Sequence, residues 1–205
     1  MKQQIVLASG NKGKISEIQA ILQQQSIDVI SQSHFNVTEV DETGTTFIEN
    51  AIIKARHAAK ISQLPAIADD SGLEVDALNG KPGVHSARYA GLPSNDQNNT
   101  DKLLRALANT PESQRSARFH CVMVFMAHEN DPSPLIAHGV WEGRIALKKS
   151  GDNGFGYDPV FYIPELNSMS AALEPEIKNT LSHRAQALKQ LMPQISQYFN
   201  KQAWA

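Results

Sequence analysis

A small basic segment near the N-terminus carries residues suited to binding phosphate. Residues 9–14 read Ser-Gly-Asn-Lys-Gly-Lys and lie between the apolar run 5–8 and a helical pattern expected to start at Ile15. Free backbone N–H groups at a helix N-terminus, together with two lysines, favour an anion. The spacing of Gly10 and Gly13 fits neither the Walker A motif nor the dinucleotide fingerprint. The segment alone predicts either a polyphosphate site or an ordinary strand-to-helix turn with solvated lysines.

Two acidic clusters offer oxygen ligands for a metal ion. Asp69 and Asp70 are expected at the end of a short buried strand over residues 65–68, and Asp41 and Glu42 lie just before a predicted helix. In phosphate chemistry, Mg²⁺ is usually held by one or two carboxylates and by the substrate's own phosphate oxygens. Each cluster alone is also compatible with a capped turn or with plain surface charge.

A segment of glycines and aromatic residues follows in the second half of the chain. Residues 154–161 read Gly-Phe-Gly-Tyr-Asp-Pro-Val-Phe. The glycines on either side of Phe155 would let its ring approach a planar ligand, and stacking of a base on such a ring contributes about 1–3 kcal/mol. Tyr157 and Phe161 are instead expected to be core residues. The segment therefore predicts a place for a nucleobase beside Phe155.

The hydrophobic pattern alternates strands and helices in the first third and pairs strands in the middle. Thr46 and Glu49 match a capping box in front of a helix of four or five turns. Further expected elements are a strand over 27–30, loops over 73–91, a helix near 101–108, a long antiparallel hairpin of strands 117–127 and 135–147, a strand over 159–163, and a helix over 182–199 with Ser182 as its cap and an interruption or kink at Pro193. We therefore predict an α/β fold with an elongated mixed central sheet flanked by helices. Residues 1–205 would form one domain of two lobes with an active-site cleft between them.

Composition argues against several classes of protein. The chain has 205 residues, of which 41% are hydrophobic, and a net charge of −2, which is unlike a general nucleic-acid or membrane-surface binder. It shows neither a signal peptide nor a run of about 20 apolar residues, so we expect a cytoplasmic protein with no membrane partner. Cys121 is the only cysteine, which excludes internal disulfides and cysteine zinc sites, and its apolar surroundings predict a core position.

Taken together, the motifs closely resemble the inosine triphosphate pyrophosphatase family, also called noncanonical purine NTP pyrophosphatases or dITP/XTP pyrophosphatases. The resemblance covers about residues 3–192 and is carried, in order, by Ser9-Gly10-Asn11-x-x-Lys14, Phe47-Ile48-Glu49-Asn50-Ala51, Asp69-Asp70-Ser71-Gly72-Leu73, Pro82-Gly83-x-x-Ser86-Ala87-Arg88-Tyr89, Gly154-Phe155-Gly156-Tyr157-Asp158-Pro159 and Ser182-His183-Arg184. Each piece is weak, but the joint pattern is specific. The resemblance implies a magnesium-dependent homodimer that hydrolyses ITP, dITP and XTP to monophosphate and pyrophosphate, and so removes damaged nucleotides from the precursor pool.

The resemblance also implies roles for individual residues. The triphosphate would be held by Ser9, Gly10, Asn11, Lys12, Gly13 and Lys14, with Lys54 as a further phosphate candidate. Glu42 and Asp70 would bind Mg²⁺, and Asp70 would be the proton acceptor. The other matched substrate-binding positions are Ser71, Phe155, Gly156, Tyr157, Asp158, Lys178, His183 and Arg184. Ser9 replaces the threonine more usual in the family and retains the hydroxyl.

The expected reaction is in-line attack of water on the α-phosphorus with pyrophosphate as the leaving group. Hydrogen bonds from His183, Arg184 or nearby N–H groups to a 6-oxo group would favour inosine and xanthosine bases over adenine. Two alternatives remain: a pyrophosphatase for modified pyrimidines, as in the distantly similar Maf-type enzymes, and a catalytically silent nucleotide-binding module. The Phe155 and His183 motifs weigh against the first, and the pair of Glu42 and Asp70 weighs against the second.

Overall fold

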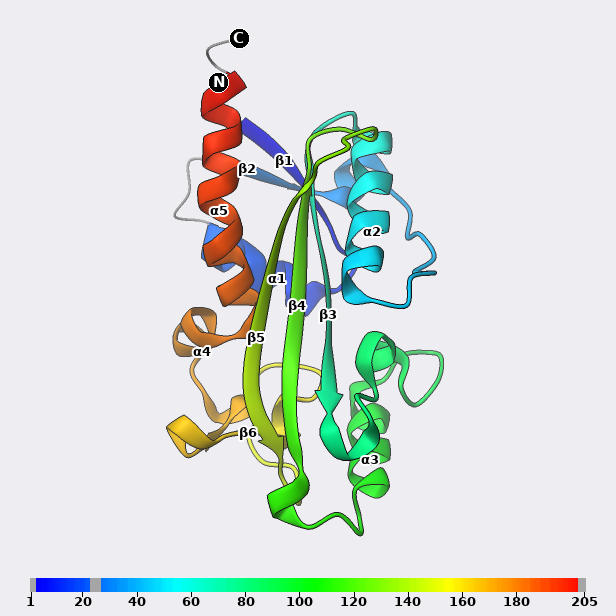
Figure 1. Ribbon diagram of the computed structural model, residues 1–205, viewed down its shortest axis with the longest axis vertical. Coiled ribbons are helices and arrows are strands. Elements are labelled where there is room, and N and C mark those ends of the chain that lie inside the picture. Colours follow the sequence, from blue (N-terminus) through cyan, green and yellow to red (C-terminus); the bar gives the residue numbers. More distant parts are fainter. Residues whose placement is uncertain (1–2, 23–26, 203–205) are drawn as a thin grey trace. The chain divides into compact units, whose positions relative to one another are not determined.

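The computed structural model describes residues 3–22 and 27–202 and has an α/β fold (Figure 1). Its seven-stranded sheet has the order β2-β1-β3-β4-β5-β6-β7. The strands are β1 (Gln3–Ala8), β2 (Ile27–Ser31), β3 (Ala66–Val75), β4 (Ser116–Met126), β5 (Leu135–Ile145), β6 (Phe161–Ile163) and β7 (Ser168–Met169). Strand β1 pairs in parallel with β2 and β3, whereas β6 pairs in antiparallel fashion with β5 and β7. The predicted mixed sheet is therefore confirmed.

Five α-helices are found in the described part of the chain: α1 (Lys12–Leu22), α2 (Phe47–Ser62), α3 (Asp96–Ala106), α4 (Pro175–Leu181) and α5 (His183–Gln202). The predicted capping box is present, because Thr46 Oγ1 accepts from the Glu49 N–H while the Glu49 carboxylate accepts from the Thr46 N–H. Helix α5 continues through Pro193. No helix in residues 3–22 and 27–202 has the length and apolar character needed to cross a membrane.

The chain divides into two compact units. The first unit contains residues 1–70, 121–139 and 184–205, and the second contains 71–120 and 140–183. Strands β3, β4 and β5 contribute residues to both. The cleft expected between two lobes stays a prediction.

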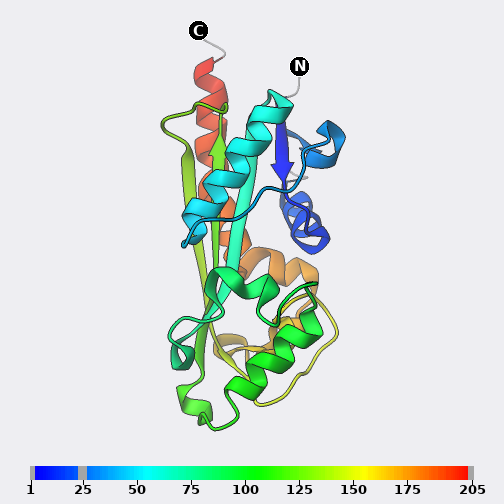
Figure 2. The ribbon, with the colours of Figure 1, turned by 90° about the vertical axis from the view of Figure 1, so that its right-hand side faces the viewer.

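The core of the first unit has one layer on each face of its strands. Ile5 and Leu7 of β1 belong to an apolar cluster with α1 and α5, whereas Val6 and Ala8 belong to another with α2. The alternation of side chains along a strand produces this division, and burial of both faces is typical of parallel strands. Figures 1 and 2 show the helices that supply these layers. Cys121 lies in the first cluster, fully buried as expected, and burial raises the pKa of its thiol to about 12.

The core of the second unit is rich in aromatic residues. The Phe161 ring lies 4.6 Å from that of Phe119 and 5.6 Å from that of Trp141, measured between centroids. Phe161 is fully buried and Tyr157 is 4% exposed, both in this cluster. The core positions predicted for these two residues are therefore confirmed.

Two predicted boundaries are wrong, one for a local reason and one for a tertiary reason. Helix α1 begins at Lys12 rather than at Ile15, because Asn11 caps it, and the helix has no acidic residue in its first turn. Strand β3 continues through Asp69 and Asp70 to Val75 instead of ending before them. Positive charges from other elements compensate these two carboxylates inside the strand, whereas local preference alone favours a turn.

Other elements differ from the prediction by a few residues or were missed. Helix α3 starts at Asp96 rather than near residue 101, because the Asn95 side chain accepts from the Asn98 N–H at 2.9 Å. Strand β6 starts at Phe161, after a short 3₁₀ turn over Asp158–Val160. Helix α4 was not predicted. Strand β2 and the two long strands β4 and β5, which are neighbours in the sheet, match the expected ranges within two residues.

Candidate active site

The turn between β1 and α1 has the backbone geometry of an anion site. The Asn11 side-chain carbonyl accepts from the Lys14 N–H at 3.0 Å, and the Asn11 N–H donates to Ser9 Oγ at 3.3 Å. The N–H groups of Lys12 and Gly13 occupy the first two helical positions, where no earlier turn offers an acceptor. The Asn11 side chain caps the helix with its carbonyl oxygen, so the NH₂ group of the same side chain can still donate to a ligand. The turn thus provides several donors for an anion.

A buried ion network begins at Lys14. Its Nζ lies 3.0 Å from Asp69 Oδ2, and Arg184 Nη2 lies 3.5 Å from the same oxygen. Arg184 also forms an ion pair through Nη1 with Glu17. Asp69 and Arg184 are each only 1% exposed. Burial alone would raise the pKa of Asp69, but nearby positive charges, chiefly those of Lys14 and Arg184, lower that pKa far below its ordinary value. Asp69 therefore stays ionised in a network of matched charges.

Lys54 connects the two predicted metal ligands. Its Nζ lies 2.8 Å from Glu42 Oε1 and 2.8 Å from Asp70 Oδ1. The Asn50 side-chain amide donates to the other oxygen of Asp70 at 3.4 Å. Burial raises the pKa of Asp70 above its ordinary value, and the positive charge of Lys54 only partly offsets this effect. The carboxylates of Glu42 and Asp70 therefore converge on one cation.

These oxygen atoms fit a hard divalent cation that a substrate helps to hold. Mg²⁺ in phosphate-transferring enzymes typically takes one or two carboxylates and completes its octahedron with substrate phosphates and water. Within residues 3–22 and 27–202, no three His, Cys, Asp or Glu side chains form a group that could hold a metal ion by themselves. The arrangement thus fits a site of this kind rather than a closed protein cage.

In the second unit, a buried carboxylate holds the Phe155 segment. Asp158 Oδ2 accepts from the Phe155 N–H at 2.8 Å and from Lys178 Nζ at 2.6 Å, while Oδ1 accepts from the Ser170 hydroxyl at 2.7 Å. Asp158 is 3% exposed. The Lys178 ammonium also lies over the Phe155 ring, 5.1 Å from its centroid. Asp158 thus fixes the backbone on one side of Phe155 and holds the cation that contacts its ring.

Two further predicted site residues are largely buried in the aromatic core of this unit. The Tyr157 hydroxyl donates to the Ser86 carbonyl at 2.8 Å. The His183 imidazole stacks on Phe119 with 4.8 Å between centroids and 11° between planes, and it also lies 6.4 Å from the ring of Trp141. Both side chains are therefore held in fixed orientations by the surrounding aromatic rings and backbone.

The predicted site residues fall into two groups, one in each unit. The first unit contains Ser9, Gly10, Asn11, Lys12, Gly13, Lys14, Glu42, Lys54, Asp70 and Arg184. The second unit contains Ser71, Phe155, Gly156, Tyr157, Asp158, Lys178 and His183. The sequence predicts that Arg184, together with His183, contributes to recognition of the base. In the structure, the Arg184 guanidinium forms ion pairs with Glu17 and Asp69.

The sequence indicates Asp69 only as a possible oxygen ligand and does not predict its ion pairs. The structure makes it the common partner of Lys14 and Arg184. The available signal was a second carboxylate directly after an apolar run, since a charge in a buried strand needs a partner of opposite charge. That signal does not name the partners, which lie on α1 and α5.

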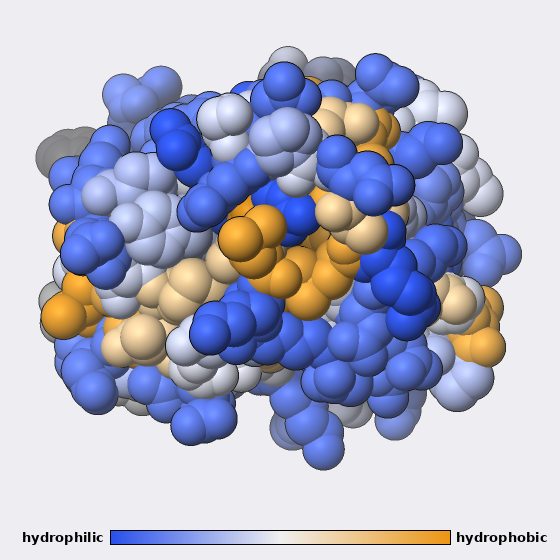
Figure 3. All heavy atoms as spheres, turned by 90° about the horizontal axis from the view of Figure 1, so that it is seen from below, coloured by the Kyte–Doolittle hydropathy of each residue, from blue (hydrophilic) through white to orange (hydrophobic). Residues whose placement is uncertain are grey.

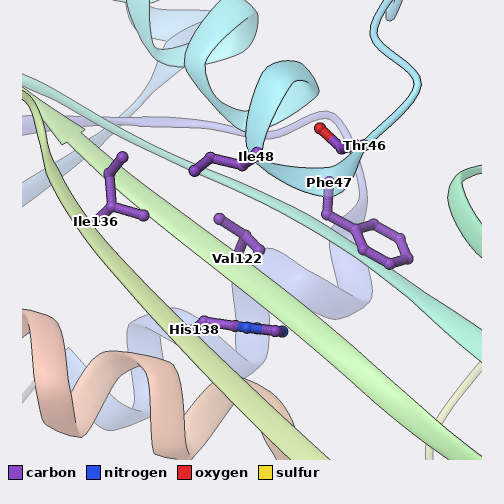
Figure 4. A pocket seen from close by; sticks show the side chains of 6 residues that line it. All are labelled: Thr46, Phe47, Ile48, Val122, Ile136 and His138. Carbon is purple, nitrogen blue, oxygen red and sulfur yellow. The ribbon is translucent and has the colours of Figure 1, made fainter.

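A hollow of different chemistry lies in the first unit, between the start of α2 and the strands β4 and β5 (Figure 4). Its lining is mostly apolar and consists of Thr46, Phe47, Ile48, Val122, Ile136 and His138. None of the predicted site residues lines it. The hollow lacks the charged groups that phosphate chemistry requires.

On the face of the molecule in Figure 3, most of the surface is hydrophilic and apolar atoms gather near the centre.

Comparisons with known proteins give concordant matches over most of the chain. The profile of the Ham1 family matches residues 5–194. A dITP/XTP pyrophosphatase of Vibrio vulnificus is 64% identical over 91% of this chain and 94% of its own, and one of Photobacterium profundum is 60% identical over 91% and 95%. A HAM1 protein from Coxiella burnetii has a TM-score of 0.88 and 54% identity, covering 95% of this chain and 99% of its own. The Ham1 protein of Staphylococcus aureus has a TM-score of 0.84 and 44% identity, over 96% and 100%.

Proposed function

Because the chain belongs to the Ham1 family, we propose that it hydrolyses noncanonical purine nucleoside triphosphates, such as ITP, dITP and XTP, to the monophosphate and pyrophosphate. Membership confirms the resemblance seen in the sequence, and the names of the relatives support the substrate class. The structural observation that carries the proposal is the meeting of Glu42 and Asp70 at one cation. Such an enzyme would remove damaged nucleotides from the precursor pool.

The phosphate end of the substrate would bind to the turn before α1. The N–H groups of Lys12 and Gly13, the Asn11 amide and the ammonium groups of Lys12 and Lys14 would supply the donors for phosphate oxygens. Ser9 and Gly10 complete the turn. Donors that are already oriented by the capped helix lose little freedom on binding and stabilise negative charge on the leaving pyrophosphate.

Glu42 and Asp70 would hold Mg²⁺, which, when bound, neutralises charge on the phosphates. Asp70 would orient the attacking water and accept its proton. Burial raises the pKa of Asp70 in the metal-free chain, and the charge of a bound Mg²⁺ would act in the opposite direction. Lys54, already in contact with both carboxylates, would supply positive charge to the same phosphates.

We propose that residues of the second unit serve the same reaction by binding the base. Phe155 would stack on the purine ring, with Gly156 allowing close approach and Tyr157, Asp158 and Lys178 supporting the segment. Ser71 would be a further substrate-binding residue. His183, held flat against Phe119, would contribute a hydrogen bond to the 6-oxo group. A site that requires such a bond leaves the amino group of adenine unpaired and so rejects it.

The proposal is tested by measuring pyrophosphate and phosphate release from ITP, XTP, dITP, ATP, GTP and a modified pyrimidine triphosphate, with Mg²⁺ or with EDTA. We expect Mg²⁺-dependent pyrophosphate release with a clear preference for the first three. Preference for the modified pyrimidine would favour a Maf-type activity. Saturable binding without any product would favour a silent binding module.

The expected homodimer and the cytoplasmic location stay predictions. Sedimentation velocity of the purified chain over a range of concentrations tests the first. A single species with the mass of one chain at all concentrations would contradict it.

A further inference from the structure

We infer that Asp96 is a positioning residue that fixes the direction of the Phe155 ring and so controls the choice of base. The inference rests on the proposed function, because it assumes that Phe155 contacts the purine. Asp96 is an exposed residue at the start of α3, sixty positions away from the segment that it contacts.

The contact is a hydrogen bond to the backbone. Asp96 Oδ2 accepts from the Gly156 N–H at 2.8 Å. Asp158 accepts from the preceding amide, the Phe155 N–H, also at 2.8 Å. Two consecutive peptide units, one on each side of the Phe155 α-carbon, are therefore each bonded to a carboxylate. Because these two units define both backbone dihedral angles of Phe155, the pair of bonds fixes the direction of its Cα–Cβ bond, from which the ring extends.

The two glycines that flank Phe155 give the segment little conformational preference of its own. Gly154 has φ of 81° and Gly156 has φ of 63°, a region that glycine enters freely and leaves freely. A Cβ added to Gly156 would meet no atom within 4 Å, so no neighbour packs against that side of the residue. The carbonyl of the second peptide unit accepts from the Asp158 N–H at 3.3 Å, and the shorter, charge-assisted bond to Asp96 holds the N–H of the same unit at 2.8 Å.

Several hydrogen bonds hold the first turn of α3, which carries Asp96. The Asn95 side chain caps α3 through the Asn98 N–H at 2.9 Å. The buried Asn99 accepts from the Ala90 N–H at 2.7 Å and donates to the Ala87 carbonyl at 2.9 Å. These bonds tie the first turn of α3 to the chain before it. The carboxylate of Asp96 therefore bonds to Gly156 from a fixed position, and its negative charge strengthens the bond.

The test compares three variants under the conditions of the nucleotide panel. Asp96→Ala removes the acceptor, Asp96→Asn retains an acceptor oxygen without the charge, and Asp101→Ala is the matched control. Asp101 is another carboxylate on α3, partly exposed, and it pairs with Lys149 at 2.6 Å rather than with the Phe155 segment. Steady-state kinetics with ITP and ATP give kcat and KM, and hydrogen exchange gives the protection of the Gly156 amide.

The Asp96→Ala variant loses one charge-assisted hydrogen bond, so we expect faster hydrogen exchange of the Gly156 amide. We also expect a KM for ITP raised roughly five- to tenfold and a smaller preference for ITP over ATP. Asp96→Asn should lie closer to the wild type, and Asp101→Ala should match it. The inference is overturned if Asp96→Ala leaves exchange and the ITP preference unchanged, or if Asp101→Ala reproduces its effects. A wild type without pyrophosphatase activity would instead reject the proposed function, and the exchange result would still decide whether Asp96 holds the segment.

Discussion

Replacing Lys54 with methionine should strengthen the binding of a divalent metal ion while it weakens turnover. Lys54 Nζ lies 2.8 Å from one oxygen of Glu42 and 2.8 Å from one oxygen of Asp70. A metal ion that binds both of these oxygens must displace the ammonium group or share the carboxylates with it. Methionine retains the length of the side chain but removes the charge, so that it relieves the competition without opening a large cavity.

The size of the effect follows from the charges. Two unit charges about 4 Å apart interact by about 4 kcal/mol at an effective dielectric constant of about 20. The Lys54 side chain is 17% exposed, and solvent and reorientation of the carboxylates reduce this value. If roughly a third of it survives, about 1.4 kcal/mol, metal affinity rises about tenfold.

The assay is Mn²⁺ binding at pH 7.5 in the absence of nucleotide, followed by electron paramagnetic resonance or calorimetry. Lys60→Met is the matched control, because Lys60 is an exposed lysine in the last turn of the same helix. Turnover of ITP by Lys54→Met should fall, since the phosphates lose a cation. Equal or weaker Mn²⁺ binding by a folded Lys54→Met variant would refute the reasoning.

Substitutions and labelling at Asp70, Cys121 and Gly154 test the electrostatics and packing. Asp70→Asn should lower kcat by roughly a hundredfold or more with an unchanged circular dichroism spectrum, and a folded variant with substantial kcat would contradict its role. Because the pKa of Asp70 is higher in the folded chain than its ordinary value of 3.8, its ionisation costs stability above that pH. The same variant should therefore have a higher Tm than the wild type at pH 7.5, and the gain should vanish as the pH falls below 3.8. Cys121, with its pKa raised to about 12, should resist iodoacetamide at pH 8 until the chain unfolds, and rapid labelling would disagree with its burial. Gly154→Ala should destabilise the fold by roughly 2 kcal/mol or more in urea titrations, since φ is 81° and the new Cβ would lie 2.1 Å from Asp158; unchanged stability would contradict this.

Features set by neighbouring residues could be predicted from the sequence. The capping box of Thr46 and Glu49 is visible as a pair three residues apart, and the structure contains both of its hydrogen bonds. The alternation of side chains between the two faces of β1 and the burial of Cys121 likewise follow from short patterns of apolar residues. Such features need no knowledge of the rest of the chain.

Features that depend on distant partners could not be predicted in the same way. Asp69 and Asp70 read locally as a turn, but Lys14, Lys54 and Arg184 compensate their charges and keep them inside β3. The ion pair of Arg184 and Glu17 joins residues 167 positions apart, which no local pattern indicates. Ion pairs between distant residues, rather than local propensity, therefore determine the conformation of these segments.

The position of water attack tests the central claim most directly. ITP is hydrolysed in H₂¹⁸O with Mg²⁺, and the products are analysed by mass spectrometry. Attack at the α-phosphorus, next to the anion-binding turn and the Glu42 and Asp70 pair, predicts that ¹⁸O enters IMP and that pyrophosphate stays unlabelled. Label in pyrophosphate, or release of IDP and phosphate, would contradict the account.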